Sequence, residues 1–163
     1  MVGKITEGVG FLLFSKNPSG IWELFTIVEL ESKPQYHKER GMLSFPLETF
    51  EERDGNFTGT IDRLIKEEIG VPLNEVVVSG IARDCFQPIP GREDVHTYYG
   101  YGLFTGNRER VFAPEDTDIK FAGWWSAELL LRQKVRVEVY PILKHFAENH
   151  SSALLDQCAQ AVS

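Results

Sequence analysis

The sequence has little cysteine, no long apolar run and no surplus of basic residues. Cys85 and Cys158 are the only two cysteines in 163 residues, and their spacing matches neither a disulfide framework nor a zinc site. No segment approaches the ~20 uninterrupted apolar residues of a membrane span. The first residues lack the basic-then-apolar layout of a signal peptide. These absences favour a reducing, cytoplasmic environment and exclude a membrane partner.

The charge balance is acidic, with 24 Asp and Glu against 17 Lys and Arg and a net charge of −7. This argues against nucleic-acid binding, which needs a basic face. It does not exclude a small anionic ligand, because a divalent metal can lie between carboxylates and a phosphate. The length, the 42% hydrophobic content and the absence of repeats predict that residues 1–163 form a single domain.

Apolar and β-branched runs separated by turn residues predict the secondary structure. Strands are expected at residues 8–14, 21–30, 75–82, 95–104 and 119–125, with helices at 60–69, 127–132, 137–149 and 151–162. Residues 47–59 are expected to be irregular, and Thr58 or Thr60 is expected to cap the first helix. This order predicts an α+β fold in which a mixed β-sheet is sandwiched between α-helices. The aromatic segment 95–104 could supply a homodimer interface.

The first predicted helix carries two carboxylates in an unusual place. Its apolar face consists of Ile61, Leu64, Ile65 and Ile69. At about 100° per residue, Glu68 falls inside this face and Glu67 lies at its edge. A carboxylate on the buried side is costly unless a cation meets it. Two neighbouring carboxylates would also repel one another, so the helix predicts a site for Mg²⁺ or a similar hard ion.

Residues 63–71 resemble the second half of the Nudix box, the signature of the MutT-like Nudix hydrolases. In that box an arginine and a glutamate precede an apolar residue, any residue, two glutamates, any residue, a glycine and an apolar residue. Leu64 departs from the pattern, because the family has glutamate there. The matching positions are Arg63, Ile65, Glu67, Glu68, Gly70 and Val71.

The first half of the box is more divergent. Residues 45–51 resemble its opening strand and proline, but Leu47 and Glu48 replace the glycine pair. Asp54 stands for the first glutamate of the box, one residue further from Arg63 than usual. Residues 118–129 are similar to the last Nudix strand and the helix after it, and residues 137–146 to the C-terminal helix. The resemblance thus covers nearly the whole chain.

The resemblance implies metal-dependent hydrolysis of the pyrophosphate of a small nucleoside diphosphate derivative, with Mg²⁺ or Mn²⁺ as cofactor. Glu67 and Glu68 would supply carboxylate ligands, and a main-chain carbonyl near Glu48 would add another. Arg63 would pair with Asp54 and hold the loop against the helix.

The general base is not defined by the resemblance. Glu115 and Asp116, before the last strand, are the first candidates, and Glu93 and Asp94 are the second.

Leu64 leaves the activity open, because leucine can neither bind metal nor hold a water molecule. Glu48, Glu51 and Asp54 are the carboxylates that could replace the missing ligand. The leading hypothesis is a pyrophosphohydrolase with a rearranged metal site. The alternatives are a non-catalytic Nudix module that binds a nucleotide or a protein partner, and an unrelated α+β domain with a chance half-box.

Overall fold

Two long parallel strands, β1 (Thr6–Lys16) and β6 (Val95–Phe104), form the centre of the fold. The computed structural model describes residues 3–150 and 152–162. The sheet runs in the order β3-β2-β1-β6-β5, with β4 paired to β1 and β7 paired to β2. All pairs except β1–β6 are antiparallel. The remaining strands are β2 (Trp22–Glu29), β3 (Leu43–Ser44), β4 (Leu47–Thr49), β5 (Val76–Ile81) and β7 (Ile119–Trp125).

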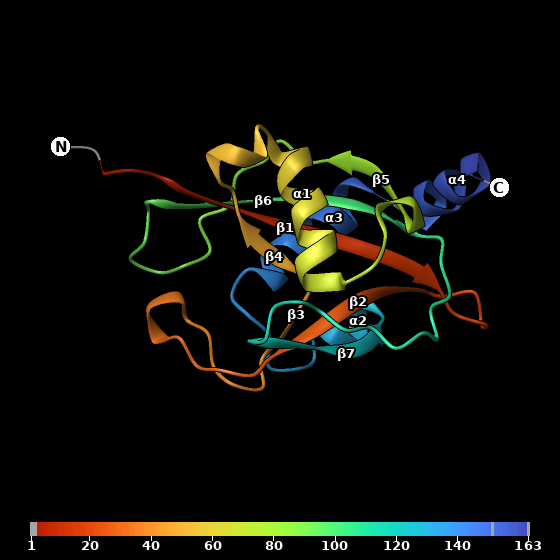
Figure 1. Cartoon of the computed structure of the whole chain (residues 1–163), viewed down its shortest axis with the longest axis horizontal. Helices are drawn as coiled ribbons and strands as arrows, with labels where there is room; N and C mark the ends of the chain where they lie inside the picture. Colours follow the sequence, from red (N-terminus) through yellow and green to blue (C-terminus); the bar gives the residue numbers. More distant parts are fainter. Residues whose placement is uncertain (1–2, 151, 163) are drawn as a thin grey trace.

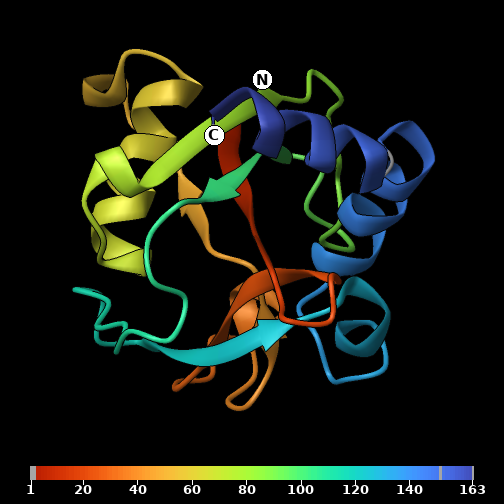
Figure 2. The same ribbon diagram turned by 90° about the vertical axis from the view of Figure 1, so that its right-hand side faces the viewer.

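Helices cover both faces of this mixed sheet. Figures 1 and 2 show α1 on one side of the sheet and the C-terminal helices, in blue, on the other. The helices are α1 (Phe57–Leu64), α2 (Ala127–Leu130), α3 (Val139–Asn149) and α4 (Ser152–Val162). The predicted α+β sandwich is therefore confirmed.

The alternation of side chains along β1 divides the core in two. Val9, Phe11 and Leu13 pack on the α1 side of the sheet, whereas Leu12 and Phe14 pack on the side of α3 and α4. All five side chains are buried. Because β1 is buried on both faces, its sequence is an almost unbroken apolar run.

The apolar stripe predicted for the first helix is confirmed. Ile61, Leu64, Ile65 and Ile69 are each at most 1% exposed. The predicted start of this helix is wrong, because it begins at Phe57 rather than near Thr60. Asn56 is the cap, and its side-chain oxygen accepts a hydrogen bond from the Gly59 amide at 2.9 Å.

The helix changes character where it carries the carboxylates. Residues Ile65–Ile69 form a π-helical turn, η3, closed by a 2.8 Å hydrogen bond from the Gly70 amide to the Ile65 carbonyl. Gly70 ends the helix in the left-handed region, at φ 77°. A π turn widens the helix and is found often at functional sites. Glu67 and Glu68 both lie in this turn.

Most other boundaries agree with the sequence to within two residues. The strands predicted at 95–104 and 119–125 have those bounds. The final helix is confirmed from Ser152, and Ser151 lies outside the described residues. Residues 47–59 are more ordered than predicted, since they contain β4 and a short 3₁₀ helix, η2 (Glu52–Asp54). β4 forms because β1 supplies its pairing partner, which is distant in sequence.

Strand β6, which could supply a homodimer interface by its sequence, has no free edge for pairing with a second copy. It is hydrogen-bonded to β1 on one edge and to β5 on the other. Tyr99 and Tyr101 are buried against the C-terminal helices. Homodimerisation therefore remains a prediction without an assigned surface. No helix in the described part of the chain has the length and apolar content to cross a membrane.

Gly70→Ala should destabilise the fold strongly. A Cβ at this position would lie 2.6 Å from the Ala113 carbonyl oxygen, in a backbone conformation that L-residues rarely adopt. We expect a loss of about 2–4 kcal/mol in the free energy of unfolding, from left-handed strain plus overpacking. Denaturant titration measures it.

Gly41→Ala is the matched control for that experiment. Gly41 also has a positive φ, of 91°, but nothing lies within 4 Å of its Cβ position. It should cost only the conformational part, about 1–2 kcal/mol. Equal losses at Gly41 and Gly70 would show that the contact with Ala113 is unimportant.

Candidate active site

The guanidinium group of Arg63 organises the end of α1. Its Nε and Nη2 donate to the two carboxylate oxygens of Asp54, each at 3.0 Å. Nη2 also donates to the Thr49 carbonyl of β4. The predicted pairing of Arg63 with Asp54 is therefore present, in a bidentate geometry that is stronger than a single contact. It holds the pKa of Asp54 well below its usual range.

Asp54 is itself fixed by its own turn. Its carboxylate accepts hydrogen bonds from the Glu51 amide and the Thr60 hydroxyl, both at 2.9 Å. The Asp54 amide in turn donates to the Glu51 carboxylate, and the two reciprocal hydrogen bonds form a capping box around η2. The two acidic residues spaced three apart were a sequence signal for this box that the motif comparison missed.

Three further carboxylates lie within 4 Å of Arg63 Nη1. Its Nη1 lies 3.3 Å from Glu48 Oε1 and 3.5 Å from Glu67 Oε2, and 3.9 Å from Glu51 Oε1. Burial raises the pKa of Glu48, and the negative charge of Glu67 raises it further, while Arg63 opposes both effects. One guanidinium therefore serves more carboxylates than it can neutralise. This excess of negative charge on hard oxygen donors is the chemistry that a divalent cation would match.

Glu68 points into the protein, as its helical phase predicts. It is 5% exposed, and its Oε2 accepts a 2.8 Å hydrogen bond from the Leu47 amide. Burial, reinforced by the charge of Glu48, raises the pKa of Glu68 well above the usual value. The contact with Leu47 ties the π turn to β4.

The register of β4 selects which main-chain carbonyl faces these carboxylates. The Phe50 amide donates to the Glu7 carbonyl and the Phe11 amide to the Pro46 carbonyl, so the residues that flank β4 bond to β1, and Glu48 falls in the same alternation. Leu47 lies between two of these residues, so its main chain points away from β1, and its amide donates to the Glu68 carboxylate instead. The Leu47 carbonyl points away from β1 as well, because both main-chain groups of a residue in this position do so. It is therefore the carbonyl near Glu48 that could bind a cation.

The loop before β7 brings Glu115 and Asp116 to the same place. The Asp116 amide donates to the Glu67 carbonyl at 3.0 Å. The Asp116 carboxylate accepts a 2.9 Å hydrogen bond from the Asp118 amide, so one of its oxygens is already engaged. Glu115 is exposed and has no such contact among the described residues, which makes it the freer of the two acids.

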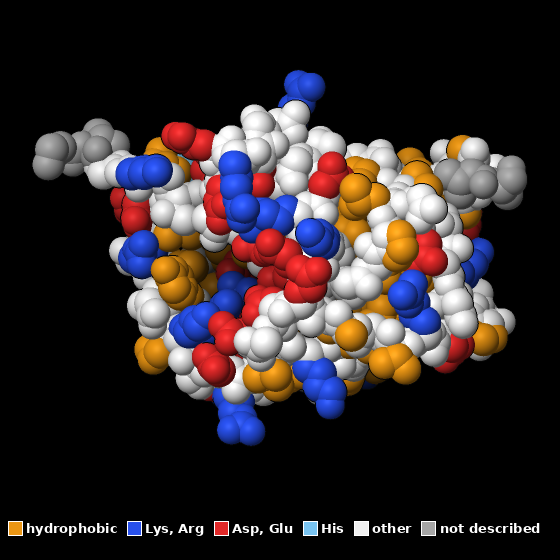
Figure 3. Space-filling view, in the orientation of Figure 1, with side chains coloured by type: hydrophobic (Ala, Val, Ile, Leu, Met, Phe, Trp, Pro, Cys, Tyr) orange, Lys and Arg blue, Asp and Glu red, His pale blue; other side chains and the backbone are white. Residues whose placement is uncertain are grey.

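These side chains line one cavity of about 410 Å³. Figure 3 shows acidic side chains gathered over the middle of this face, beside a hollow. Arg53 is a lining residue that the sequence analysis did not select. Glu93 and Asp94 are not among the lining residues, and Asp94 pairs with Arg92 at 2.9 Å instead. The lining residues are Glu48, Glu51, Arg53, Arg63, Glu67, Glu115 and Asp116.

The donors suit a hard cation, but the carboxylates alone are too few. Within residues 3–150 and 152–162, no three His, Cys, Asp or Glu side chains are gathered so that they could hold a metal ion. Leu64 is fully buried in the apolar core, at 0% exposure, where the box has a glutamate. A cation bound to Glu48 and Glu67 would therefore need further oxygens from the main chain, from water or from a phosphate.

Comparison with known proteins identifies the architecture. No model of a protein family matches the sequence, and no curated protein sequence matches it. Solved structures do match. The NUDIX domain of Shewanella oneidensis NrtR, complexed with ADP ribose, has a TM-score of 0.67 at 13% identity and covers 91% of this chain and 89% of its own.

Two further structures agree with that match. A C. elegans Ap4A hydrolase has a TM-score of 0.62 at 14% identity, covering 88% of this chain and 96% of its own. RenU, a Nudix hydrolase from M. smegmatis, has a TM-score of 0.61 at 11% identity, covering 89% and 88%. The chain is thus an α+β protein whose carboxylate-bearing helix lies on one face of a mixed sheet. Its architecture is the Nudix fold.

Asp54→Asn should weaken the fold in a pH-dependent way. Asparagine replaces the bidentate charged contact with Arg63 by a neutral one, at a cost of about 2–3 kcal/mol at pH 7. Because folding lowers the pKa of Asp54 below the unfolded value of 3.8, the contribution of its carboxylate is present above that pH and is lost as the pH falls further. The difference between variant and parent should therefore shrink below pH 4. Urea titrations across this range measure it.

Asp94→Asn provides the control for a surface pair. Arg92 and Asp94 are 37% and 43% exposed, so solvent screens their ion pair and its loss should change stability little. An Asp54 variant as stable as the Asp94 variant at pH 7 would contradict the organising role of Arg63.

Proposed function

We propose that this protein is a metal-dependent pyrophosphohydrolase acting on a small nucleoside diphosphate derivative. The supporting observation is the single cavity that gathers Glu48, Glu67 and Glu115 around Arg63 on a Nudix fold. Each of these residues comes from a different element, so they come together only when the chain is folded. Nucleotide-type ligands also occur among similar folds, since one such structure holds ADP ribose and another is an Ap4A hydrolase.

In the proposed reaction, water attacks one phosphorus of the pyrophosphate and the bridging P–O bond breaks. The products are two phosphate esters, and the proton lost by the attacking water passes to a carboxylate. Glu115 is the proposed acceptor because its carboxylate is exposed at the cavity. Asp116 is the second candidate, with its main chain fixed to Glu67.

Glu48 and Glu67 are the proposed carboxylate ligands of Mg²⁺ or Mn²⁺, with the Leu47 carbonyl beside them. Glu68, which the sequence also predicted as a ligand, does not line the cavity; it accepts a hydrogen bond from the Leu47 amide, and burial raises its pKa well above the usual value, so we propose that it holds β4 in place instead. A bound divalent ion would neutralise phosphate oxygens and lower the pKa of the attacking water. Arg63 keeps Glu48 and Glu67 together when no ion separates them.

A non-catalytic nucleotide-binding module is the second candidate. It is favoured by Leu64, which fills a core position, and by the lack of three gathered ligands among the described residues. The same cavity could then bind a diphosphate, without cleaving it, through a cation that offsets the excess of carboxylates.

Turnover of a nucleotide panel separates the two candidates. With Mg²⁺ or Mn²⁺, we expect hydrolysis of at least one nucleoside diphosphate derivative. Glu67→Gln should reduce it by about 10²-fold or more, because the variant loses a charged ligand. Glu148→Gln, an exposed substitution on α3, is the matched control and should retain the parent rate. Binding of the nucleotides without turnover in the parent protein would support the module instead.

Leu64→Glu tests the missing ligand directly. Leu64 lies one turn before Glu68 and faces the interior as Glu68 does, so a glutamate there would add a carboxylate on the buried side of the helix, away from Glu48 and Glu67. We expect unchanged Mg²⁺ affinity by calorimetry, together with lower stability because a charge enters the apolar core. Leu64→Met, which conserves volume, should change neither property much. Tighter Mg²⁺ binding by a folded Leu64→Glu protein would contradict this placement and locate the cation on the buried side of the helix, beside Glu68.

A further inference from the structure

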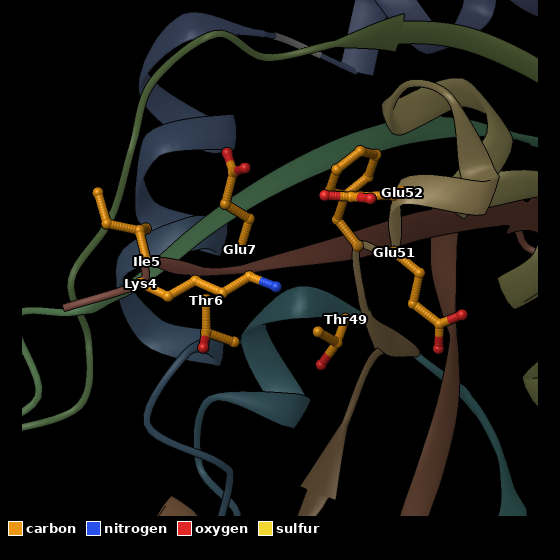
Figure 4. Close-up of a pocket in the computed structure, with 8 residues that line it drawn as sticks. Lys4, Ile5, Thr6, Glu7, Thr49, Glu51 and Glu52 are labelled. Atoms are coloured by element: carbon orange, nitrogen blue, oxygen red, sulfur yellow. The ribbon is translucent and has the colours of Figure 1, made fainter.

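Two hollows outside the candidate active site differ in their chemistry. One lies where the chain enters β1 and shares Glu51 with the active-site cavity, and Figure 4 shows the charged side chains of Lys4, Glu7 and Glu52 around it. The other, of about 300 Å³, lies on the side of the sheet away from α1, and none of its described lining residues is charged. The lining residues of this apolar cavity are Phe14, Trp22, Ala127, Leu143, Phe146, Ala147, His150, Ser152 and Leu155.

Five elements meet around the apolar cavity. Strands β1 and β2 contribute to its wall, and the other residues come from α2, α3, α4 and the position that follows α3. Figure 2 shows α3 and α4, in blue, on the opposite side of the sheet from α1, in yellow. Phe14, Phe146 and Leu155 are each at most 8% exposed, so the cavity reaches down to the core. Its volume is at the lower end of the ~300–1,000 Å³ typical of small-molecule sites.

Short side chains leave this space open beside a fixed aromatic wall. Ala127 on α2 and Ala147 on α3 line the cavity at positions where longer side chains would fill it. The indole of Trp22 is held in place, since its Nε1 donates to Asp156 of α4 at 3.1 Å and Lys16 Nζ lies 5.3 Å from the centre of its ring. The cavity is therefore already formed in the unliganded chain.

His150 is the polar ring in this apolar lining. It packs against Phe146 and Tyr101, with ring centroids 5.0 and 4.8 Å apart. Its ring nitrogens make no hydrogen bond to any other residue that the structure describes. Burial lowers the pKa of His150, so its imidazole is neutral at pH 7. A neutral imidazole offers one hydrogen-bond donor and one acceptor, and both are available to a ligand.

These features select an uncharged aromatic ligand. Apolar cavities hold water poorly and take up small aromatic molecules, and aromatic walls add ring contacts. A carboxylate or phosphate would lose its hydration in the cavity, with no cation among the described lining residues to compensate. A hydroxyl or N–H group loses little, because His150 can bond to it.

We propose that the apolar cavity is a second binding site, which takes a small uncharged aromatic molecule carrying one hydroxyl or N–H group. The ring of the ligand lies against Trp22 and Phe146, and its polar group bonds to His150. Because the proposed reaction needs a substrate that carries phosphate, this ligand is not that substrate. The site is therefore independent of the proposed function.

An NMR titration of the whole protein tests the proposal, with p-cresol as the probe and toluene and p-toluate as comparisons. The indole N–H signal of Trp22 should shift saturably with p-cresol, while that of Trp124, which packs on the other side of the sheet, should not. We expect p-cresol to bind about fivefold more tightly than toluene, because it adds one hydrogen bond. The anion p-toluate should not bind.

Variants locate the probe. Ala147→Leu should abolish the saturable shift by filling the cavity, whereas Glu148→Leu, the same side chain at the next position of α3 and outside the lining, should preserve it. His150→Phe keeps the ring packing and should lower the affinity for p-cresol to that for toluene.

Three results would contradict the proposal. Absence of a saturable shift in the parent protein, or a shift that Ala147→Leu leaves unchanged, would show that the cavity is only a packing defect. Binding of p-toluate as tight as that of p-cresol would overturn the assignment to an uncharged ligand. An unchanged preference for p-cresol over toluene in His150→Phe would overturn the hydrogen bond to His150.

Discussion

The whole site depends on the contacts that the guanidinium group of Arg63 makes. It joins the 3₁₀ turn at Asp54, the main chain of β4 at Thr49 and the carboxylates of Glu48 and Glu67. These groups belong to segments that no regular hydrogen-bond ladder would otherwise join to the helix. Because the guanidinium is planar and has five donors, it can bond Asp54 on one side and face the other acids on the other.

The buried carboxylate of Glu68 makes a second connection, and the two act on the same strand. Arg63 bonds to the carbonyl of Thr49, while Glu68 bonds to the amide of Leu47. The short strand β4 is thus held between β1 and the helix. The π turn at Ile65–Ile69 carries both Glu67 and Glu68, one toward the cavity and one toward the interior. The gathered negative charge is the electrostatic cost of this arrangement, and it is the basis of the proposed cation site.

The agreement between the sequence-based predictions and the structure differs from one segment of the chain to another. Periodicity alone predicted that Glu68 would be buried within the apolar stripe, and the motif resemblance implied that Arg63 would pair with Asp54. The start of α1 was misplaced because Asn56 competes equally well with Thr58 and Thr60 as a cap. Strand β4 was missed because three residues form a strand only when a distant partner, β1, supplies the hydrogen bonds.

The sequence by itself determined the local and periodic features. The apolar stripe, the glycine that ends the helix and the alternating pattern of the strands follow from rules that act over a few residues. Only the tertiary structure decided that Glu48, Glu67 and Glu115 share one cavity, and that Glu51 separates it from a second hollow. Such neighbours come from four different segments, and their approach depends on how the sheet and helix pack, which no short-range pattern encodes.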